Sequence, residues 1–277
     1  MQDTMLNLGH IIYSNCFLPH AGIVTGKTRF PFNLVEGIPS ELNRLLYEGN
    51  LDVSPSSSIE YAIHPGRYLL LPGFSITSKS KVMSIILKSR VPITDLTNRS
   101  VALTSASATS IVLLRILLER FYKVHPVYSS FKQGEEDPFA KADAALFIGD
   151  LALRTIPTDD FPHCFDLGAL WHERTGLPFV FALWQINNSK NSIDNDLSQL
   201  YDILRESRGY GISHLEELAE SKAAHFNVPA SLLREYWRSF SFLLEEEEQK
   251  GLLTFYKHAA DLGVIKPITD LCFWKKG

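Results

Sequence analysis

The sequence has few cysteines, no metal-ligand motif and no long basic run. Its three cysteines, Cys16, Cys164 and Cys272, lie far apart and form no CxxC pair. An odd number of widely spaced cysteines indicates thiols in a reducing compartment rather than a disulfide or zinc framework. The nine histidines show no HExxH motif or comparable ligand spacing. We therefore expect no structural metal.

Charge and hydropathy argue against two further classes of protein. The formal net charge is -4, and the only basic run is Lys275 and Lys276. Nucleic acid is therefore not an expected partner, because its binding needs a basic surface patch. No apolar run is long enough to span a bilayer, and the N-terminal residues lack the basic and apolar parts of a secretory signal. We expect a cytoplasmic protein without a membrane partner.

What the sequence does contain is an alternation of apolar strands and helices. A chain of 277 residues buries about three quarters of its unfolded surface, which suffices for one large or two medium lobes. Strands that alternate with helices predict parallel sheets covered on both faces. The apolar runs predict strands at 8–13, 51–54, 68–71, 82–87, 101–103, 124–128, 144–148 and 179–184.

Start and stop signals place the helices between these strands. Pro39 opens a helix that Gly49 closes, Asp166 caps one that Gly176 ends, and Ser57 to Glu60 form a capping-box pattern. Residues 19–32 contain two glycines and Pro31 and are predicted to form a loop. After residue 187 the chain is predicted to be helical at 196–208, 213–226, 229–237 and 245–263, with a short strand at 239–243.

We therefore expect an α/β fold of two lobes, each a mostly parallel sheet flanked by helices, with a helical C-terminal tail. Residues 1–93 and 187–277 are predicted to form the first, discontinuous lobe. Residues 94–186 are predicted to form the second lobe, inserted into the first. In folds with this plan a ligand lies between the lobes, at the carboxyl ends of strands.

A hydroxyl-rich turn leads from the strand at 101–103 into a helix. Ser107 precedes this helix, and Thr109 and Ser110 lie in its first turn. A helix start offers free N–H groups and a partial positive charge, so this turn suits a carboxylate or a phosphate. The alternative, which is commoner for a single turn, is that Ser107 only caps the helix. A second such entrance at Ser56 favours an anion site between two facing helix starts.

Three other polar residues are candidates for the same cleft. Asn15 follows the first strand, and its amide either donates to a ligand or satisfies a turn. Asp150 follows the strand at 144–148 and is either a base or, more commonly for this position, an N-cap. Ser84 lies within an apolar strand and either bonds the backbone or points into the cleft. His10 and His20 flank the tip of the first strand, where a lone histidine is more often structural than catalytic, so neither is taken as a site residue.

Six motifs occur in order along the chain: IIYSNCFLP, GNLDVSPSSSIEY, LLPGFSITSKSKVMSIILKS, VALTSASATSIVLL, DAALFIGDLAL and DLGALWHERTGLPFVFALW. Together they resemble the chorismate dehydratases of the futalosine route of menaquinone biosynthesis, densely over the first two thirds of the chain and loosely over the tail. The resemblance implies a type II periplasmic-binding-protein-like fold and a cytoplasmic lyase. It also implies a reaction without a cofactor, in which chorismate loses water to give 3-[(1-carboxyvinyl)oxy]benzoate.

The same resemblance implies which residues contact the substrate. Asn15 and Ser84 are implied as catalytic residues, and the implied substrate-binding residues are Ser56, Ser107, Thr109, Ser110 and Asp150. Ser14 departs from the family pattern, in which a bulkier apolar residue commonly precedes Asn15. We hypothesise that the helix start at 107–110 holds one carboxylate and that Asn15 orients the enolpyruvyl group or stabilises developing charge. The substrate's own enolpyruvyl carboxylate would then take the proton.

Two alternatives share this fold. The first is a solute-binding protein for a small carboxylate, against which the missing leader argues. The second is the related 1,4-dihydroxy-6-naphthoate synthase, whose catalytic histidine matches no particular position in this chain. The sequence leaves the oligomeric state open between monomer and homodimer.

Overall fold

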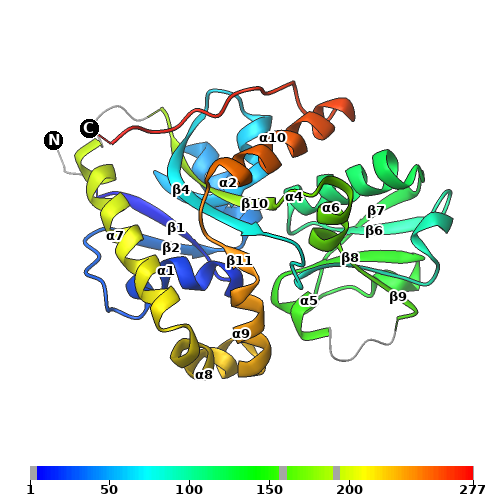
Figure 1. Ribbon diagram of the computed structural model, residues 1–277, viewed down its shortest axis with the longest axis horizontal. Coiled ribbons are helices and arrows are strands. Elements are labelled where there is room, and N and C mark those ends of the chain that lie inside the picture. Colours follow the sequence, from blue (N-terminus) through cyan, green and yellow to red (C-terminus); the bar gives the residue numbers. More distant parts are fainter. Residues whose placement is uncertain (1–4, 156–160, 190–193, 277) are drawn as a thin grey trace.

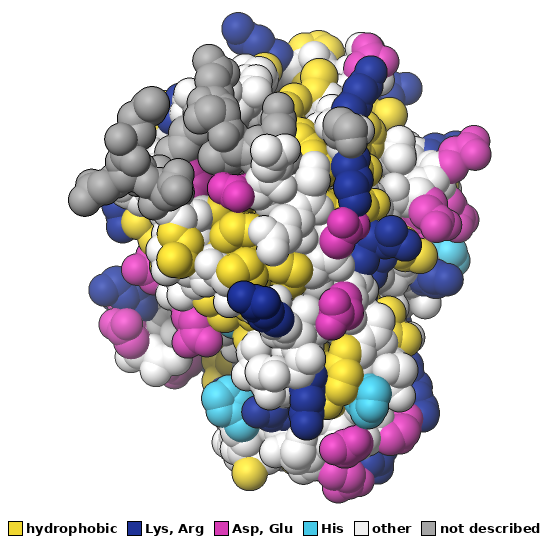
Figure 2. Space-filling view, turned by 90° about the vertical axis from the view of Figure 1, so that its left-hand side faces the viewer, with side chains coloured by type: hydrophobic (Ala, Val, Ile, Leu, Met, Phe, Trp, Pro, Cys, Tyr) yellow, Lys and Arg dark blue, Asp and Glu magenta, His cyan; other side chains and the backbone are white. Residues whose placement is uncertain are grey.

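The structure is a computed structural model that describes residues 5–155, 161–189 and 194–276. Two separate β-sheets lie side by side, each with helices packed on it (Figure 1). Within the described residues, no helix combines the length and apolar character needed to cross a membrane. On the face shown in Figure 2, Lys and Arg side chains are interspersed with Asp and Glu, so neither sign dominates that surface.

The first sheet has the strand order β11-β4-β10-β3-β1-β2. Strand β1 runs parallel to β2 and β3, whereas β10 runs antiparallel to β3 and β4. The antiparallel pairing of β11 with β4 completes the sheet. The strands are β1 (Asn7–Ile11), β2 (Asn33–Gly37), β3 (Val53–Ser57), β4 (Tyr68–Ser78), β10 (Phe179–Asn187) and β11 (Phe240–Ser241).

The second sheet has the order β7-β6-β8-β5-β9. Strand β6 runs parallel to β7 and β8, and β5 runs antiparallel to β8 and β9. The strands are β5 (Ile85–Ser89), β6 (Ser100–Thr104), β7 (Val127–Phe131), β8 (Ala144–Ile148) and β9 (His163–Asp166).

Helices connect the strands and form the C-terminal tail. Those that follow strands of the first sheet are α1 (Phe17–Val24), α2 (Pro39–Glu48) and α3 (Ser58–Ile63). Those of the second sheet are α4 (Ala108–Arg115), which continues as π-helix to Tyr122, α5 (Gly149–Thr155) and α6 (Leu167–Thr175). The tail consists of α7 (Asp194–Ser213), α8 (Leu215–Phe226), α9 (Ala230–Arg238) and α10 (Glu246–Asp261).

The expected α/β fold with two sheets and a helical tail is confirmed, but the sheets are mixed rather than mostly parallel. The reason is that β5 and β10, the strands that follow the two crossings between the sheets, pair antiparallel with their neighbours. The crossings also come earlier than the expected boundaries at residues 93 and 186. Strand β5 already belongs to the second sheet, and β10 belongs entirely to the first.

Three local predictions were wrong. Helix α1 covers residues 19–24 of the loop expected at 19–32, although it contains Pro19 and Gly22. Strand β3 runs through Pro55 to Ser57, because the strand pairs antiparallel with β10 on this side rather than ending at the proline. The predicted capping box at Ser57 is absent, because the side chain of Ser57 makes no cap hydrogen bond.

Helix α1 is possible in this sequence because it packs closely on α7. Gly211 of α7 lies so near to α1 that an added Cβ would be 2.1 Å from the carbonyl oxygen of Leu18. At Gly22, an added Cβ would be 2.8 Å from the Cα of Ser207. Glycine at these two positions therefore removes the steric barrier to close helix packing, which offsets its low helix propensity. This contact fixes the tail on the first sheet.

This packing predicts opposite effects for two glycines of α7. Gly211→Ala should lower the free energy of unfolding by about 3 kcal/mol, because the methyl group overlaps a backbone oxygen and the helices must move apart. The matched control is Gly209→Ala on the exposed side of α7, where an added Cβ meets nothing within 4 Å. It should raise stability by up to about 1 kcal/mol. Urea denaturation measures both, and equal effects of the two substitutions would contradict the close contact.

Candidate active site

Two helix starts meet between the sheets. Thr109 in the first turn of α4 accepts a hydrogen bond from the backbone N–H of Ile59 in the first turn of α3, at 3.1 Å. The hydroxyl oxygens of Thr109 and Ser58 are 3.4 Å apart. Thr109 thus supplies to α3 the cap that Ser57 does not provide. The expectation that the two hydroxyl-rich entrances face each other is therefore confirmed.

A pocket lies beside this contact and takes residues from both sheets. Its polar side chains are all uncharged, and its remaining lining is apolar apart from the backbone of Gly149. The polar lining residues are Tyr13, Asn15, Ser57, Ser84, Ser107 and Ser110. The others include Ile11, Ile76, Ile85, Ile148, Phe181 and Ala182. Among the described residues of this lining, none carries a carboxylate, an imidazole or a basic group.

The pocket contains an unpaired acceptor. Within the described structure, the carboxamide oxygen of Asn15 is buried and has no hydrogen-bond partner. A buried polar atom without a partner is costly, and its presence at a pocket wall is typical of a ligand contact. Asn15 lies in the short 3-10 turn Ser14–Cys16, between β1 and α1. An amide group can accept or donate, so Asn15 suits a ligand hydroxyl or carboxylate.

Ser107 and Ser110 form a linked pair at the start of α4. The hydroxyl of Ser107 accepts from the backbone N–H of Ser110 at 3.3 Å, and the two hydroxyl oxygens are 2.9 Å apart. Ser107 is thus the N-cap, as one of the two readings of the sequence held. It also lines the pocket, so capping and ligand contact are not exclusive.

Three of the expected site residues do not line this pocket. Ser56 points away from it and is fully buried, whereas its neighbour Ser57 lines the pocket, because successive side chains of a strand alternate between faces. Thr109 is used by the contact with α3. The carboxylate of Asp150 accepts from the backbone N–H of Ser14 at 3.2 Å and from the Ser14 hydroxyl, instead of capping its own helix.

The Asp150 contact joins the two sheets at the edge of the pocket. Burial raises the pKa of the Asp150 carboxyl, although the hydrogen bonds from Ser14 act in the opposite direction. Gly149, the residue before it, has φ +65°, and its added Cβ would be 3.3 Å from the ring of Tyr13. Burial, together with the charge of Asp150, raises the pKa of the Tyr13 phenol. Sequence analysis missed Tyr13, because nothing in the motif distinguishes it from a core aromatic.

A larger groove of about 680 Å³ adjoins the pocket on the other side of Tyr13. Tyr13 and Ile148 line both spaces. The groove carries Arg154 and Lys222 together with Asp150 and Glu36, and two histidines, His10 and His225. The pocket, by contrast, has a volume of about 50 Å³. Ligand sites for small molecules usually enclose about 300–1,000 Å³, so the pocket in this arrangement is smaller than a usual ligand site.

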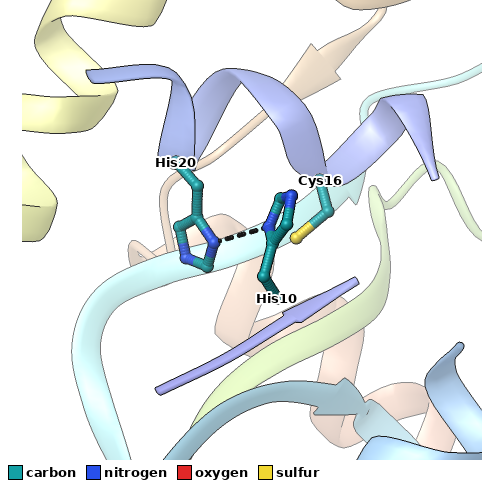
Figure 3. Close-up of side chains that lie close together, drawn as sticks. All are labelled: His10, Cys16 and His20. Carbon is teal, nitrogen blue, oxygen red and sulfur yellow. Dashed lines mark hydrogen bonds between the residues drawn. The ribbon is translucent and has the colours of Figure 1, made fainter. Parts of the chain in front are cut away.

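His10, His20 and Cys16 form a buried cluster behind the pocket (Figure 3). Trp184 Nε1 donates to His20 Nε2 at 3.1 Å, so the His20 hydrogen lies on Nδ1 and is donated to His10 Nδ1 at 2.8 Å. Tetrahedral zinc would hold two imidazole nitrogens roughly 3.3 Å apart. Burial raises the pKa of the Cys16 thiol to about 12. The distance between the two nitrogens therefore fits a hydrogen bond between neutral imidazoles better than a bound metal ion.

Comparisons with known proteins identify the family of this chain. A family model described as "Menaquinone biosynthesis" matches residues 6–261. The chain belongs to this menaquinone biosynthesis family. Chorismate dehydratase of Thermus thermophilus is 34% identical over 81% of this chain and 85% of its own length. The 1,4-dihydroxy-6-naphthoate synthase of the same organism is 26% identical over 88% of this chain and 90% of its own length.

Solved structures show the fold. A protein from Archaeoglobus fulgidus is similar with a TM-score of 0.75 and 18% identity, over 96% of this chain and 100% of that one. A Candida albicans protein described as having the generic periplasmic binding protein fold has a TM-score of 0.64 and 10% identity, over 99% and 98% of the two chains. The expected periplasmic-binding-protein-like fold is therefore confirmed for this member of the menaquinone biosynthesis family.

The histidine pair predicts a loss of stability in mild acid. Burial lowers the pKa of His10 to about 4 and that of His20 well below 6.5. As the pH falls from 7 to 5, the unfolded chain therefore binds protons that the folded chain excludes. Protonation of His10 in the unfolded chain should by itself lower the free energy of unfolding by about 2 kcal/mol over this pH range. Urea denaturation at both pH values should show a smaller loss for His10→Gln. His172→Gln, at an exposed position of α6, is the control. If His10→Gln lost as much unfolding free energy between pH 7 and 5 as the wild type, the stability loss would not come from His10.

Proposed function

We propose that this protein is a chorismate dehydratase, a lyase that converts chorismate into 3-[(1-carboxyvinyl)oxy]benzoate and water in the futalosine route of menaquinone biosynthesis. The observation that carries the proposal is the pocket between the two sheets, in which uncharged donors and two meeting helix starts surround one site. The named relative at 34% identity supports it. A cytoplasmic location is part of the proposal.

The donors of the pocket suit a substrate with two carboxylates. Preoriented N–H and O–H dipoles stabilise an anion without a buried counter-charge. The start of α4, with Ser107 and Ser110, would hold one carboxylate. Ser84 and Ser57 enter from other elements and are placed to donate to the second carboxylate or to ring substituents. Asn15 would contact the enolpyruvyl side or the hydroxyl that leaves.

The reaction itself is an elimination that forms an aromatic ring. The C3–H bond breaks, its electron pair forms the new ring double bond, and the C4–O bond breaks as hydroxide departs. Hydroxide and the abstracted proton leave as water, so no electron is gained or lost overall. Since the described residues lining the pocket include no carboxylate or imidazole, the substrate's own enolpyruvyl carboxylate is the base we propose. The protein then contributes orientation and stabilisation of developing charge.

We also propose that each sheet moves with its helices as a lobe. Of the described residues, one lobe would comprise 5–78, 179–189 and 194–276, and the other 85–155 and 161–175. The 50 Å³ pocket corresponds to a closed arrangement, and the groove with Arg154 and Lys222 would be its mouth. Lobe opening would break the contact of Asp150 with Ser14.

The proposal predicts turnover of chorismate by the purified protein. An ultraviolet assay should show the aromatic product at a rate proportional to enzyme concentration, without added cofactor. Binding measured by calorimetry without any product would instead indicate a solute-binding protein. Turnover of the cyclised nucleoside substrate of 1,4-dihydroxy-6-naphthoate synthase, with none of chorismate, would assign the chain to that enzyme.

Asn15 provides a prediction at the level of one residue. Asn15→Ala should lower kcat with chorismate by about a hundredfold, because removal of one preoriented polar group from a charge-stabilising site typically has an effect of this size. The matched control is Asn33→Ala, at an exposed position at the start of β2, which should leave kcat unchanged. If Asn15→Ala turned over chorismate like the wild type, the role of Asn15 would be wrong.

A further inference from the structure

Helix α9 lies outside the pocket and donates hydrogen bonds to two residues, one on each side of it. Its consecutive residues Tyr236 and Trp237 are both buried and donate in different directions. The hydroxyl of Tyr236 donates to the hydroxyl oxygen of Ser84 at 2.7 Å. The indole N–H of Trp237 donates to the carbonyl oxygen of Ser14, next to Asn15, at 2.8 Å. Neither ring lines the pocket itself.

The place of α9 in the fold allows this double contact. Helices α8 and α9 lie below the first sheet in the view of Figure 1, with α9 on the side toward α5. The ring of Trp237 stacks on Phe17 of α1, with ring centres 5.5 Å apart. The same apolar cluster includes Met83 and Leu153, which flank the second sheet. Tyr236 is therefore held rigidly in a position that faces Ser84.

The backbone around Ser84 is fixed independently of Tyr236. Met83 has φ +63°, an uncommon conformation for a residue with a side chain. It persists because the carboxylate of Asp166 accepts from the backbone N–H groups of Val82 and Met83, at 3.0 and 2.6 Å. The carbonyl oxygen of Ser84 accepts from the N–H of Gly149 at 2.8 Å. The remaining freedom of Ser84 is the direction of its hydroxyl hydrogen.

Tyr236 restricts that direction. A serine hydroxyl has one hydrogen and two lone pairs, and Tyr236 donates to one of the lone pairs. The Ser84 hydrogen is then free to be donated elsewhere, and Ser84 lines the pocket. A hydroxyl that accepts one hydrogen bond becomes a better donor in the next, so the Tyr236–Ser84 chain strengthens donation into the pocket.

We propose that Tyr236 is a positioning residue that directs the Ser84 hydroxyl hydrogen toward a carboxylate of the bound substrate. This inference rests on the proposed function, because it assumes that the pocket binds a dicarboxylate. Tyr236 acts through Ser84 alone, so its effect should disappear when Ser84 has no hydroxyl. Since Ser84 holds the substrate as well as the transition state, the loss should appear in KM rather than in kcat.

The experiment is a double-mutant cycle in steady-state kinetics with chorismate. Tyr236→Phe and Ser84→Ala should each raise KM about tenfold with kcat within about twofold of the wild type, and the double variant should show no further rise. Tyr68→Phe is the matched control, because Tyr68 is equally buried but donates to Glu60 in the first sheet, away from the pocket. It should leave KM unchanged.

The outcomes separate this inference from the proposed function. Wild-type turnover or binding of chorismate tests the function, and if neither is found both proposals fall. With binding but no turnover, the same cycle is measured as Kd. If Tyr236→Phe leaves KM unchanged, or raises it as much in the Ser84→Ala background as in the wild type, the positioning role is overturned. KM does not depend on the folded fraction, so partial unfolding of a variant leaves the test valid. The positioning role is also overturned if Ser84→Ala has the same KM as the wild type.

Discussion

The contact between the starts of α3 and α4 is the constraint on which the pocket depends. The first N–H groups of a helix have no partner within the helix, and Ser57 does not cap α3 with its side chain. The hydroxyl of Thr109, from the other sheet, takes that place. This bond exists only when the two sheets are close together. The same contact therefore brings together the two walls of the pocket, with Ser57 from the first sheet and Ser107 from the second.

The uncharged lining follows from the cost of burying charge. A cation buried to hold each carboxylate would lose much of its hydration, and the attraction often does no more than offset that loss. Dipoles of fixed hydroxyl and N–H groups hold an anion at a smaller cost, because the fold has already oriented them. The charged groups Arg154, Lys222 and Glu36 line the adjoining groove instead, and Asp150 lies between the two spaces with its carboxylate bonded to Ser14.

The sequence predicted the features that have local causes. The Ser107 and Asp166 caps and the glycines that end α2 and α6 were found because short-range hydrogen bonds and a positive φ determine them. Features set by partners distant in the chain were missed. Helix α1 depends on its contact with α7, and β3 continues through Pro55 because of its pairing with β10. Ser84 lies before β5 rather than within it, because Met83 is held by Asp166. Ser57, rather than the expected Ser56, lines the pocket, because β3 continues to Ser57 and its side chains alternate between faces.

Two short crossings, at residues 79–84 and 176–178, connect the sheets. Two neighbouring covalent connections would allow one sheet to rotate relative to the other about the line through both connections. They would resist translation and twisting of the sheets against each other. In the proposed opening of the lobes, the far edge of the cleft would therefore move most and the hinge side least. Ser84 lies at the end of the first crossing, so a ligand group bound there would travel little between the open and closed arrangements. The ligand group bound at Ser84 would therefore be the fixed point about which the rest of the ligand is oriented.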